Sequence, residues 1–414
     1  MADSGVMVTA ENPEQFREPT ASEFAGTMEV RHVRSPYERF MAAEGIPQYV
    51  QNGFHDVREL DLAPWDRYGA RGAFLVCGAT LDQLGISVLE IAPRATTEPV
   101  RHLYEQVHWV IEGRGTAEVW TEPNGPRQRF EWREGSFFAI PLNATYRLLN
   151  ASTNRVLILA GNNAPPVIDA FQDEDFIFAN PYAFRSRYNG EDDYFAPATE
   201  TYGTPDLGRA MWRTSLIPDI VGNELPLDNQ RSPGYRRIQP QMARGRFRCF
   251  VGEHVVGRYS KAHYHTSGAV LICVKGEGYT YNWPIEAGST PWANGHGDAV
   301  ERVDYVAGGM VAAAPGGGNW YHQHFGVGPH PLRLLVWSGS AGGSRTAQLI
   351  KAVARGSGLD ESEVATRGVW LNQETGKGGH TVGYRDEDPH IRAEFIRALA
   401  ERGGEFAMPA DLYM

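Results

Sequence analysis

From about residue 69 onward, the chain consists of short apolar runs separated by turn residues. Residues 86–91 alternate between apolar and polar side chains over most of their length, which is the period of two expected of a half-buried β-strand. Similar runs follow as far as residue 160, with Gly, Pro or Asn between them. About eight such strands are enough to close an antiparallel barrel.

The strand pattern of the first half returns in the second half. Residues 111–115, with the sequence IEGRG, correspond to VKGEG at 274–278, which lies 163 residues later. Residues 137–141 correspond to 311–315 at an offset of 174 residues. A repeat with matching strand and turn positions indicates two copies of one unit. We therefore predict an all-β protein with two tandem barrels.

Helical patterns lie outside the two barrels. Pro36 stands where a first helical turn is expected and Gly45 where a helix would end, so a short N-terminal helix is predicted. Residues 348–355 also have a helical pattern, and an Asp-Pro pair at 388–389 begins an amphipathic helix. The predicted organisation is an N-terminal arm at 1–65, a first barrel at 66–162, an ordered linker at 163–240, a second barrel at 241–342 and a C-terminal helical arm at 343–414.

The composition argues against several partners. The 414 residues suffice for two domains. A net charge of −11, with arginines that look scattered, argues against nucleic acid as a partner. No apolar run approaches the roughly 18 residues of a membrane span, and the first 26 residues lack an apolar leader. The isolated cysteines Cys77, Cys249 and Cys273 are expected to be buried thiols in a reducing compartment, hence a cytoplasmic protein.

Two histidine pairs in the second half predict a metal site. His263 and His265 are two residues apart, so they project from one face of a strand. His322 and His324 follow a Pro-Gly turn, which lets their strand approach another strand closely. The first pair and one later histidine would supply three neutral imidazoles and leave coordination positions open. Such a set suits Fe(II), Cu, Ni or Zn.

These residues resemble the motifs of the cupins, and the resemblance covers both halves of the chain. Most cupins have a glutamate where Ala269 stands here, seven residues before Gly276. Ring-cleaving bicupins similar to gentisate 1,2-dioxygenase have a small residue there. Their second motif, Trp-x-Trp-His-Asp-His-Gly, is similar to WYHQHF at 320–325. The resemblance implies two jelly-roll barrels and Fe(II) held by His263, His265 and His322, with His324 near the metal or the substrate.

The resemblance further implies a non-haem Fe(II)-dependent dioxygenase. Its reaction would be extradiol-type cleavage of a small hydroxylated, carboxylated aromatic such as gentisate or salicylate, with O2 as co-substrate. Mn, Ni and Cu stay open as alternatives to Fe(II), and a homodimer or homotetramer is expected. Two departures bear on the substrate. First, the gentisate group holds iron in its N-terminal barrel, whereas the histidine set stands in the C-terminal barrel here. The ligand positions of the first barrel read Val100, His102, Gln106 and Tyr146. Second, the loop at 316–318 is longer than usual.

Further residues are candidates for handling the substrate. His324 could accept a phenolic proton, or it could only bond a turn or a neighbouring strand. Arg258 and Arg333 could bind a carboxylate, or each could pair with a surface acid. Four aromatic residues could form the wall of a pocket, or could belong to the core: Trp320, Tyr279, Tyr281 and Trp337.

Two other function classes stay open. The first is another metal-dependent cupin enzyme, such as a dicarbonyl or thiol dioxygenase, a decarboxylase, a lyase or an isomerase. Ala269 in place of the glutamate argues against decarboxylases of the oxalate type. The second is a non-enzymatic bicupin that binds or stores small molecules. Dependence on O2 would separate the ring-cleaving enzyme from lyases and isomerases, and absence of bound metal would favour the binding protein.

Overall fold

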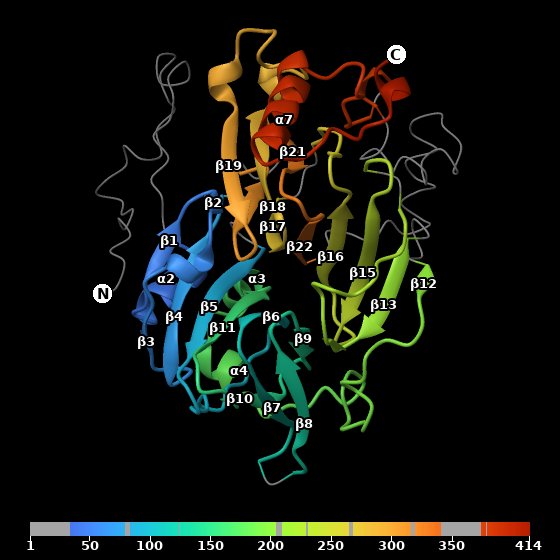
Figure 1. Cartoon of the computed structure of the whole chain (residues 1–414). Helices are drawn as coiled ribbons and strands as arrows, with labels where there is room; N and C mark the ends of the chain where they lie inside the picture. The colour runs from blue at the N-terminus through green and yellow to red at the C-terminus, as the bar shows by residue number, and fades with distance from the viewer. Residues whose placement is uncertain are drawn as a thin grey trace, which may run out of the picture. The chain divides into compact units, whose positions relative to one another are not determined.

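The computed structural model describes residues 34–414 except 79–82, 124, 204–208, 229–230, 265–267, 316–318, 341–373 and 378. Pro36–Met414 form one compact unit. β-Sheets make up most of its regular secondary structure (Figure 1). None of the helices in the described part of the chain has the length and apolar character needed to cross a membrane.

The first half of this unit contains one large and one small sheet. In the large sheet the strands lie in the order β4 (Ala70–Val76), β5 (Gly85–Ile91), β11 (Val156–Asn162), β6 (Gln106–Glu112) and β9 (Phe137–Ile140). The small sheet has the order β10 (Thr145–Asn150), β7 (Arg114–Trp120) and β8 (Gln128–Arg133). Phe138 of the large sheet packs against Phe130 and Trp132 of the small sheet, so the two sheets enclose a barrel interior.

The second half repeats this strand order. Its large sheet contains β15 (Arg236–Met242), β16 (Phe247–His254), β22 (Leu332–Ser340), β17 (Ala269–Lys275) and β20 (Met310–Ala313). Its small sheet has the order β21 (Trp320–Gly326), β18 (Glu277–Pro284) and β19 (Glu301–Val306). The matching orders confirm the predicted all-β fold of two tandem barrels.

The pairing also corrects one part of the predicted repeat. Gln106 pairs with Ile140 in the first barrel, and Ala269 pairs with Ala313 in the second. Ile140 and Ala313 are 173 residues apart, so the predicted offset of 174 is wrong by one residue. The identity of Pro141 and Pro315 suggested the longer offset. Ala314, which has a φ of +60°, is the additional residue before Pro315.

Short strands from outside the barrels extend the large sheets, and in each copy one of them joins the sheet of the other barrel. In the first copy, β1 (Gln48–Val50) runs parallel to β4, and β2 (Gly53–Phe54) pairs with β20 of the second barrel. In the second copy, β13 (Ala210–Thr214) runs parallel to β15, and β14 (Leu216–Ile217) pairs with β9 of the first barrel. The repeat therefore extends into the predicted arm and the predicted linker. Two further strands, β3 (Ala63–Trp65) and β12 (Tyr202–Gly203), pair with β4 and β13.

Strands of the large sheets are buried on both faces. On β22, Leu334 and Val336 belong to the core inside the second barrel, whereas Leu335 and Trp337 belong to the main core that also includes the first barrel. Trp337 packs on Gly161, where an added Cβ would lie 2.5 Å from the indole. Two buried faces explain why these strands are apolar along their whole length.

Four α-helices occur among the described residues: α2 (Pro36–Ala43), α3 (Ala164–Phe171), α4 (Glu174–Phe178) and α7 (Pro389–Glu401). The predicted helices at Pro36 and Pro389 are confirmed, and Asp388 caps α7 by accepting a hydrogen bond from the His390 amide. The helix predicted at 348–355 lies outside the described residues. Short 3₁₀ turns occur at Val57–Glu59, Ile285–Ala287, Gly297–Ala299, Thr375–Lys377 and Ala410–Tyr413.

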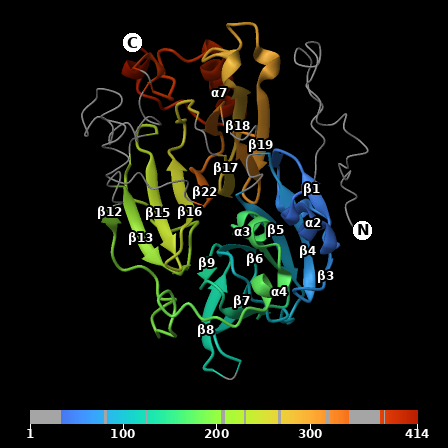
Figure 2. The same ribbon diagram turned by 180° about the vertical axis from the view of Figure 1, so that it is seen from behind.

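The C-terminal arm covers the outer face of the small sheet of the second barrel. Phe395 of α7 packs on Phe325 of β21, and Arg302 of β19 pairs with Glu394 of α7. Both views show α7 beside the upper ends of these strands (Figures 1 and 2). Cys77, Cys249 and Cys273 are buried thiols, as predicted.

Candidate metal centre

Backbone pairing brings His263 and His322 together. The amide of each residue donates to the carbonyl of the other, at 3.1 and 2.9 Å, in an isolated antiparallel bridge. Both side chains are buried, and their ring centroids are 4.3 Å apart. Two segments that are distant in the sequence thus place two imidazoles side by side.

Each of these imidazoles is oriented by a backbone carbonyl two residues earlier in its own segment. The Nδ1 of His263 lies 3.1 Å from the Lys261 carbonyl oxygen, and that of His322 lies 3.2 Å from the Trp320 carbonyl oxygen. A carbonyl only accepts hydrogen bonds, so each Nδ1 carries a proton, and in the neutral imidazole this leaves the lone pair on Nε2. Metal-binding histidines are commonly fixed in this way. The pair therefore fits the metal that the resemblance implies.

The third predicted ligand, His265, lies outside the described residues. Within the described ranges, no group of three or more His, Cys, Asp or Glu side chains is arranged to hold a metal ion. A complete three-histidine set therefore depends on His265, which stays a prediction. Its position two residues after His263 would direct it to the same face if the extended backbone continues.

His324 lies on the same face of β21 as His322. Its ring centroid is 5.6 Å from that of His322 and 6.3 Å from that of His263. Its Nδ1 lies 2.9 Å from Oγ1 of Thr280 on β18. His324 therefore bonds a neighbouring strand, which is one of the two alternatives predicted for it.

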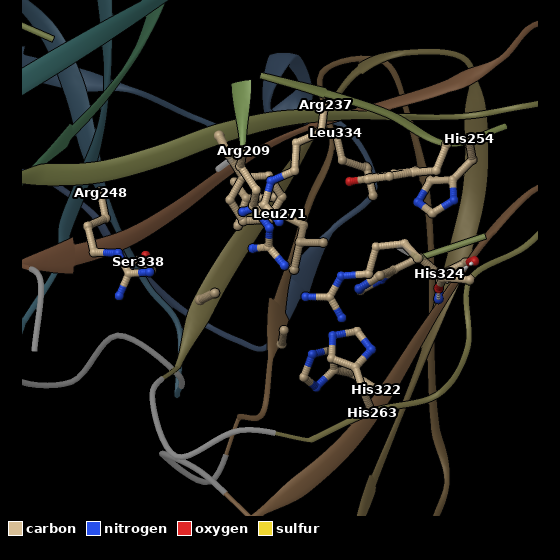
Figure 3. Close-up of a pocket in the computed structure, with 17 residues that line it drawn as sticks. Arg209, Arg237, Arg248, His254, His263, Leu271, His322, His324, Leu334 and Ser338 are labelled. Carbon is tan, nitrogen blue, oxygen red and sulfur yellow. Dashed lines mark hydrogen bonds between the residues drawn. The ribbon is translucent and has the colours of Figure 1, made fainter. Parts of the chain in front are cut away.

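The histidines border a cavity of about 150 Å³. Its apolar wall comes from inward-facing residues of the large sheet, namely Ala269, Leu271, Ala313, Leu334 and Val336. Four arginines also line it, namely Arg209, Arg231, Arg237 and Arg248. Figure 3 shows Arg209 and Arg237 across the cavity from His263 and His322, with Arg248 beside Ser338.

Arg237 is the most deeply buried of these cations. It lies on β15 opposite Gly252 and is 5% exposed. Its guanidinium carbon lies 3.8 Å from the centroid of the Phe250 ring. Burial, and then the charge of Arg209, lowers the pKa of Arg237 to about 9. This is the expected response of a cation removed from water next to another cation.

Two neighbours of Arg237 share this electrostatic environment. Burial, with a smaller contribution from the charge of Arg209, lowers the pKa of Arg231 to about 10. Burial, together with the charge of Arg231, lowers the pKa of His254 to about 3, so His254 is neutral. The pocket therefore carries concentrated positive charge in a low-dielectric wall.

The structure places Arg333 and Trp337 away from the pocket, contrary to their predicted substrate contacts. Arg333 alternates with the inward-facing Leu334 and points to the opposite side of the sheet. There it pairs with Glu253 at 2.7 Å and donates to Ile220 O and Asn223 Oδ1. Trp337 faces the same way and packs on Gly161. Both side chains join the barrel to other parts of the fold.

Tyr279 and Tyr281 also lie outside the pocket. On β18 they alternate with Thr280 and Asn282, which face the barrel interior. Tyr279 stacks on Phe325 with centroids 4.6 Å apart, in the aromatic core under the C-terminal arm. Their predicted place in an aromatic pocket wall is therefore wrong, because they occupy the opposite face of their strand.

The last two candidates lie at the edges of the barrel. Arg258 donates to the carbonyl oxygens of Ala407 and Pro233, each at 3.0 Å, and so ties the C-terminal arm to the barrel. Trp320 is half-buried at the start of β21, and its carbonyl orients His322. Neither side chain is part of the cavity wall.

The arginine cluster is the feature that the sequence analysis missed. Residues 231–248 contain six arginines, so the description of the arginines as scattered is wrong for this segment. This density, together with strand alternation before His254, was the available signal. This signal could not show that Arg237 faces the cavity and that Arg236 faces away from it.

The first barrel has the same geometry with different side chains. Val100 and Tyr146 form the bridge equivalent to that of His263 and His322. His102 stacks on Tyr104 and His108 stacks on Phe138. Burial lowers the pKa of His102 to about 4 and that of His108 to about 3. Valine and tyrosine at the paired positions remove the imidazole pair from this barrel.

Comparisons with known proteins identify structural similarity only. No protein-family model matches the chain, and no curated protein matches it. An oxalate decarboxylase variant of Bacillus subtilis is 11% identical over 75% of this chain and 85% of that chain, with a TM-score of 0.43. A vicilin of Corylus avellana (hazelnut) is 13% identical over 76% and 96%, with a TM-score of 0.44. Similarity at this level carries no argument about metal, substrate or activity.

Proposed function

We propose that this protein is a metal-dependent enzyme whose reaction takes place in the second barrel. The observation that carries the proposal is the oriented pair of His263 and His322 beside a buried cavity lined by arginines. Of the activities expected from the sequence, dioxygenase cleavage of a hydroxylated, carboxylated aromatic ring agrees best with these features.

The dimensions and lining of the cavity support a small anionic substrate. An apolar cavity of roughly this size is known to accommodate a benzene ring, and the volume here is about 150 Å³. Ala269 and Leu271 supply apolar wall for a ring, whereas Arg237 supplies a fork that matches a carboxylate. A carboxylated single ring satisfies both parts of the lining.

The residues of the chain have separate roles in this proposal. His263, His322 and His265 would hold Fe(II), which supplies redox exchange with O2 and open positions for a chelating substrate. Arg237 would orient the carboxylate, and orientation lowers the entropic part of the barrier. His324, fixed by Thr280, would accept the phenolic proton at Nε2.

One competing class of reaction receives less support. Decarboxylation of the oxalate type uses a carboxylate next to the metal. Ala269 stands at that position, and the residues that line the cavity include no Asp or Glu among those the structure describes. Lyases, isomerases and simple binding proteins are separated from ring cleavage by their lack of O2 consumption, whereas a dicarbonyl or thiol dioxygenase is separated by its lack of O2 uptake with an aromatic acid.

Oxygen uptake by the iron-loaded protein tests the proposal. The protein is loaded anaerobically with Fe(II), mixed with gentisate, salicylate or a related hydroxybenzoate, and exposed to O2. We expect substrate-dependent uptake that His263→Ala abolishes and that His330→Ala, a change at an exposed histidine, leaves intact. One bound metal with no uptake on any aromatic acid would refute ring cleavage.

A further inference from the structure

The arginines of the pocket carry more positive charge than the described protein neutralises. Arg237 is 5% exposed, and its Nε and Nη1 atoms are buried without a hydrogen-bond partner among the described residues. It forms no ion pair with a described carboxylate. A buried guanidinium without a partner is costly, because water has been removed and nothing replaces it.

Arg231 adds a second uncompensated charge beside Arg237. Asp228 is the acidic residue among the main charges that act on both arginines. Asp228 is also the partner of Arg209, at 4.0 Å. The nearby Glu253 faces the other side of the sheet and pairs with Arg333. Neither Arg231 nor Arg237 forms an ion pair with a carboxylate of the described residues, which leaves two positive charges for a ligand.

We propose that the pocket binds a compact organic dianion with two carboxylates, at least one of which is held by Arg237 and Arg231. A ligand with one carboxylate would leave one buried cation without a partner. Guanidinium groups bind carboxylates through paired hydrogen bonds, and the unused nitrogens of Arg237 are available for them. His254, which is neutral next to Arg231, has a buried Nδ1 without a partner in the described chain and can add a hydrogen bond.

The inference rests on the proposed function for the reaction, and it narrows the substrate to an aromatic ring with two carboxylates. The binding itself requires no metal. The two proposals therefore fail separately. Selective binding of dicarboxylates without oxygen uptake would refute only ring cleavage. Oxygen uptake on monocarboxylates, with no preference for dicarboxylates, would refute only the dianion.

Binding of simple aromatic acids to the metal-free protein tests the dianion. Isothermal titration compares benzoate with phthalate, isophthalate and terephthalate, and includes inorganic phosphate as a different anion. We expect the best dicarboxylate to bind at least tenfold more tightly than benzoate. Equal affinities would overturn the proposal, and so would tighter binding of phosphate than of every dicarboxylate.

An arginine variant separates ligand binding from a structural role. Arg237→Gln should weaken binding of the dicarboxylate at least tenfold and leave the melting temperature of the ligand-free protein unchanged or higher, because it removes an unpaired buried charge. The matched control is Arg246→Gln, at an exposed position of the same barrel, which should change neither quantity. A lower melting temperature with unchanged dicarboxylate affinity would show that Arg237 is structural and would overturn the assignment.

Discussion

At the scale of residues, the candidate metal centre depends on backbone pairing as much as on histidine content. His263 and His322 face each other because their amides and carbonyls form one antiparallel bridge. Their Nδ1 atoms are both fixed by carbonyls two residues earlier. The same bridge in the first barrel joins Val100 and Tyr146. The difference between the two barrels therefore lies in the side chains at two equivalent positions.

Substitution of the paired histidines should remove the metal. His263→Ala and His322→Ala each delete one oriented Nε2, and loss of a ligand from a three-histidine site should reduce bound metal by about tenfold or more. His102→Ala, in the first barrel, should leave the metal in place. Metal per chain, measured by mass spectrometry after gel filtration, checks this result. Full metal in His322→Ala with loss in His324→Ala would mean that the ligand lies two residues further along β21.

At the scale of elements, sequence patterns located strands and helix starts but not the faces of the strands. The alternation at 86–91 predicted β5, and the Asp-Pro pair predicted the start of α7. Alternation identifies the inward face only when the other face is polar. β22 has apolar neighbours on both sides, so the sequence could not show that Trp337 faces away from the pocket.

The C-terminal arm and β21 meet at a buried carboxyl group. Tyr259 donates a hydrogen bond to Glu387, and Gln323 of β21 lies 3.5 Å from the same carboxyl. Burial raises the pKa of Glu387 from 4.5 to about 7. The folded protein therefore holds the carboxyl proton of Glu387 more tightly than the unfolded chain does. The stability that Glu387 contributes is complete below its ordinary pKa and is lost as the pH rises through about 7.

Glu387→Gln should remove this pH dependence, because glutamine keeps the neutral form at every pH. Between about pH 5 and 7, the free energy of unfolding of the unmodified protein should fall relative to the variant by on the order of 1 kcal/mol per pH unit. Urea denaturation at several pH values measures the free energy of unfolding of both proteins. Subtracting one value from the other at each pH removes the contribution of the buried histidines, which has the opposite sign. Glu405→Gln, at an exposed site, is the control. A constant difference across this range would contradict the buried, protonated Glu387.

At the scale of the whole molecule, duplication explains most of the architecture. The repeat in the sequence predicted two barrels, and the shared strand order confirms them. The sequence did not reveal the reciprocal pairing of β2 with β20 and of β14 with β9. These strands have only two residues each, which is too short for a detectable pattern. The arginine pocket was likewise missed, because it combines Arg237 of β15 and Arg248 of β16 with Arg209 and Arg231, which lie outside the strands.

We therefore expect the whole chain to hold one metal site, located in the second barrel. Crystals of the iron-loaded protein, measured with X-rays at the iron absorption edge, test this claim most directly. We predict a single anomalous peak per chain within bonding distance of Nε2 of both His263 and His322, and no peak between Val100 and Tyr146. A peak in the first barrel, or no peak beside His263 and His322 in iron-loaded crystals, would contradict the account.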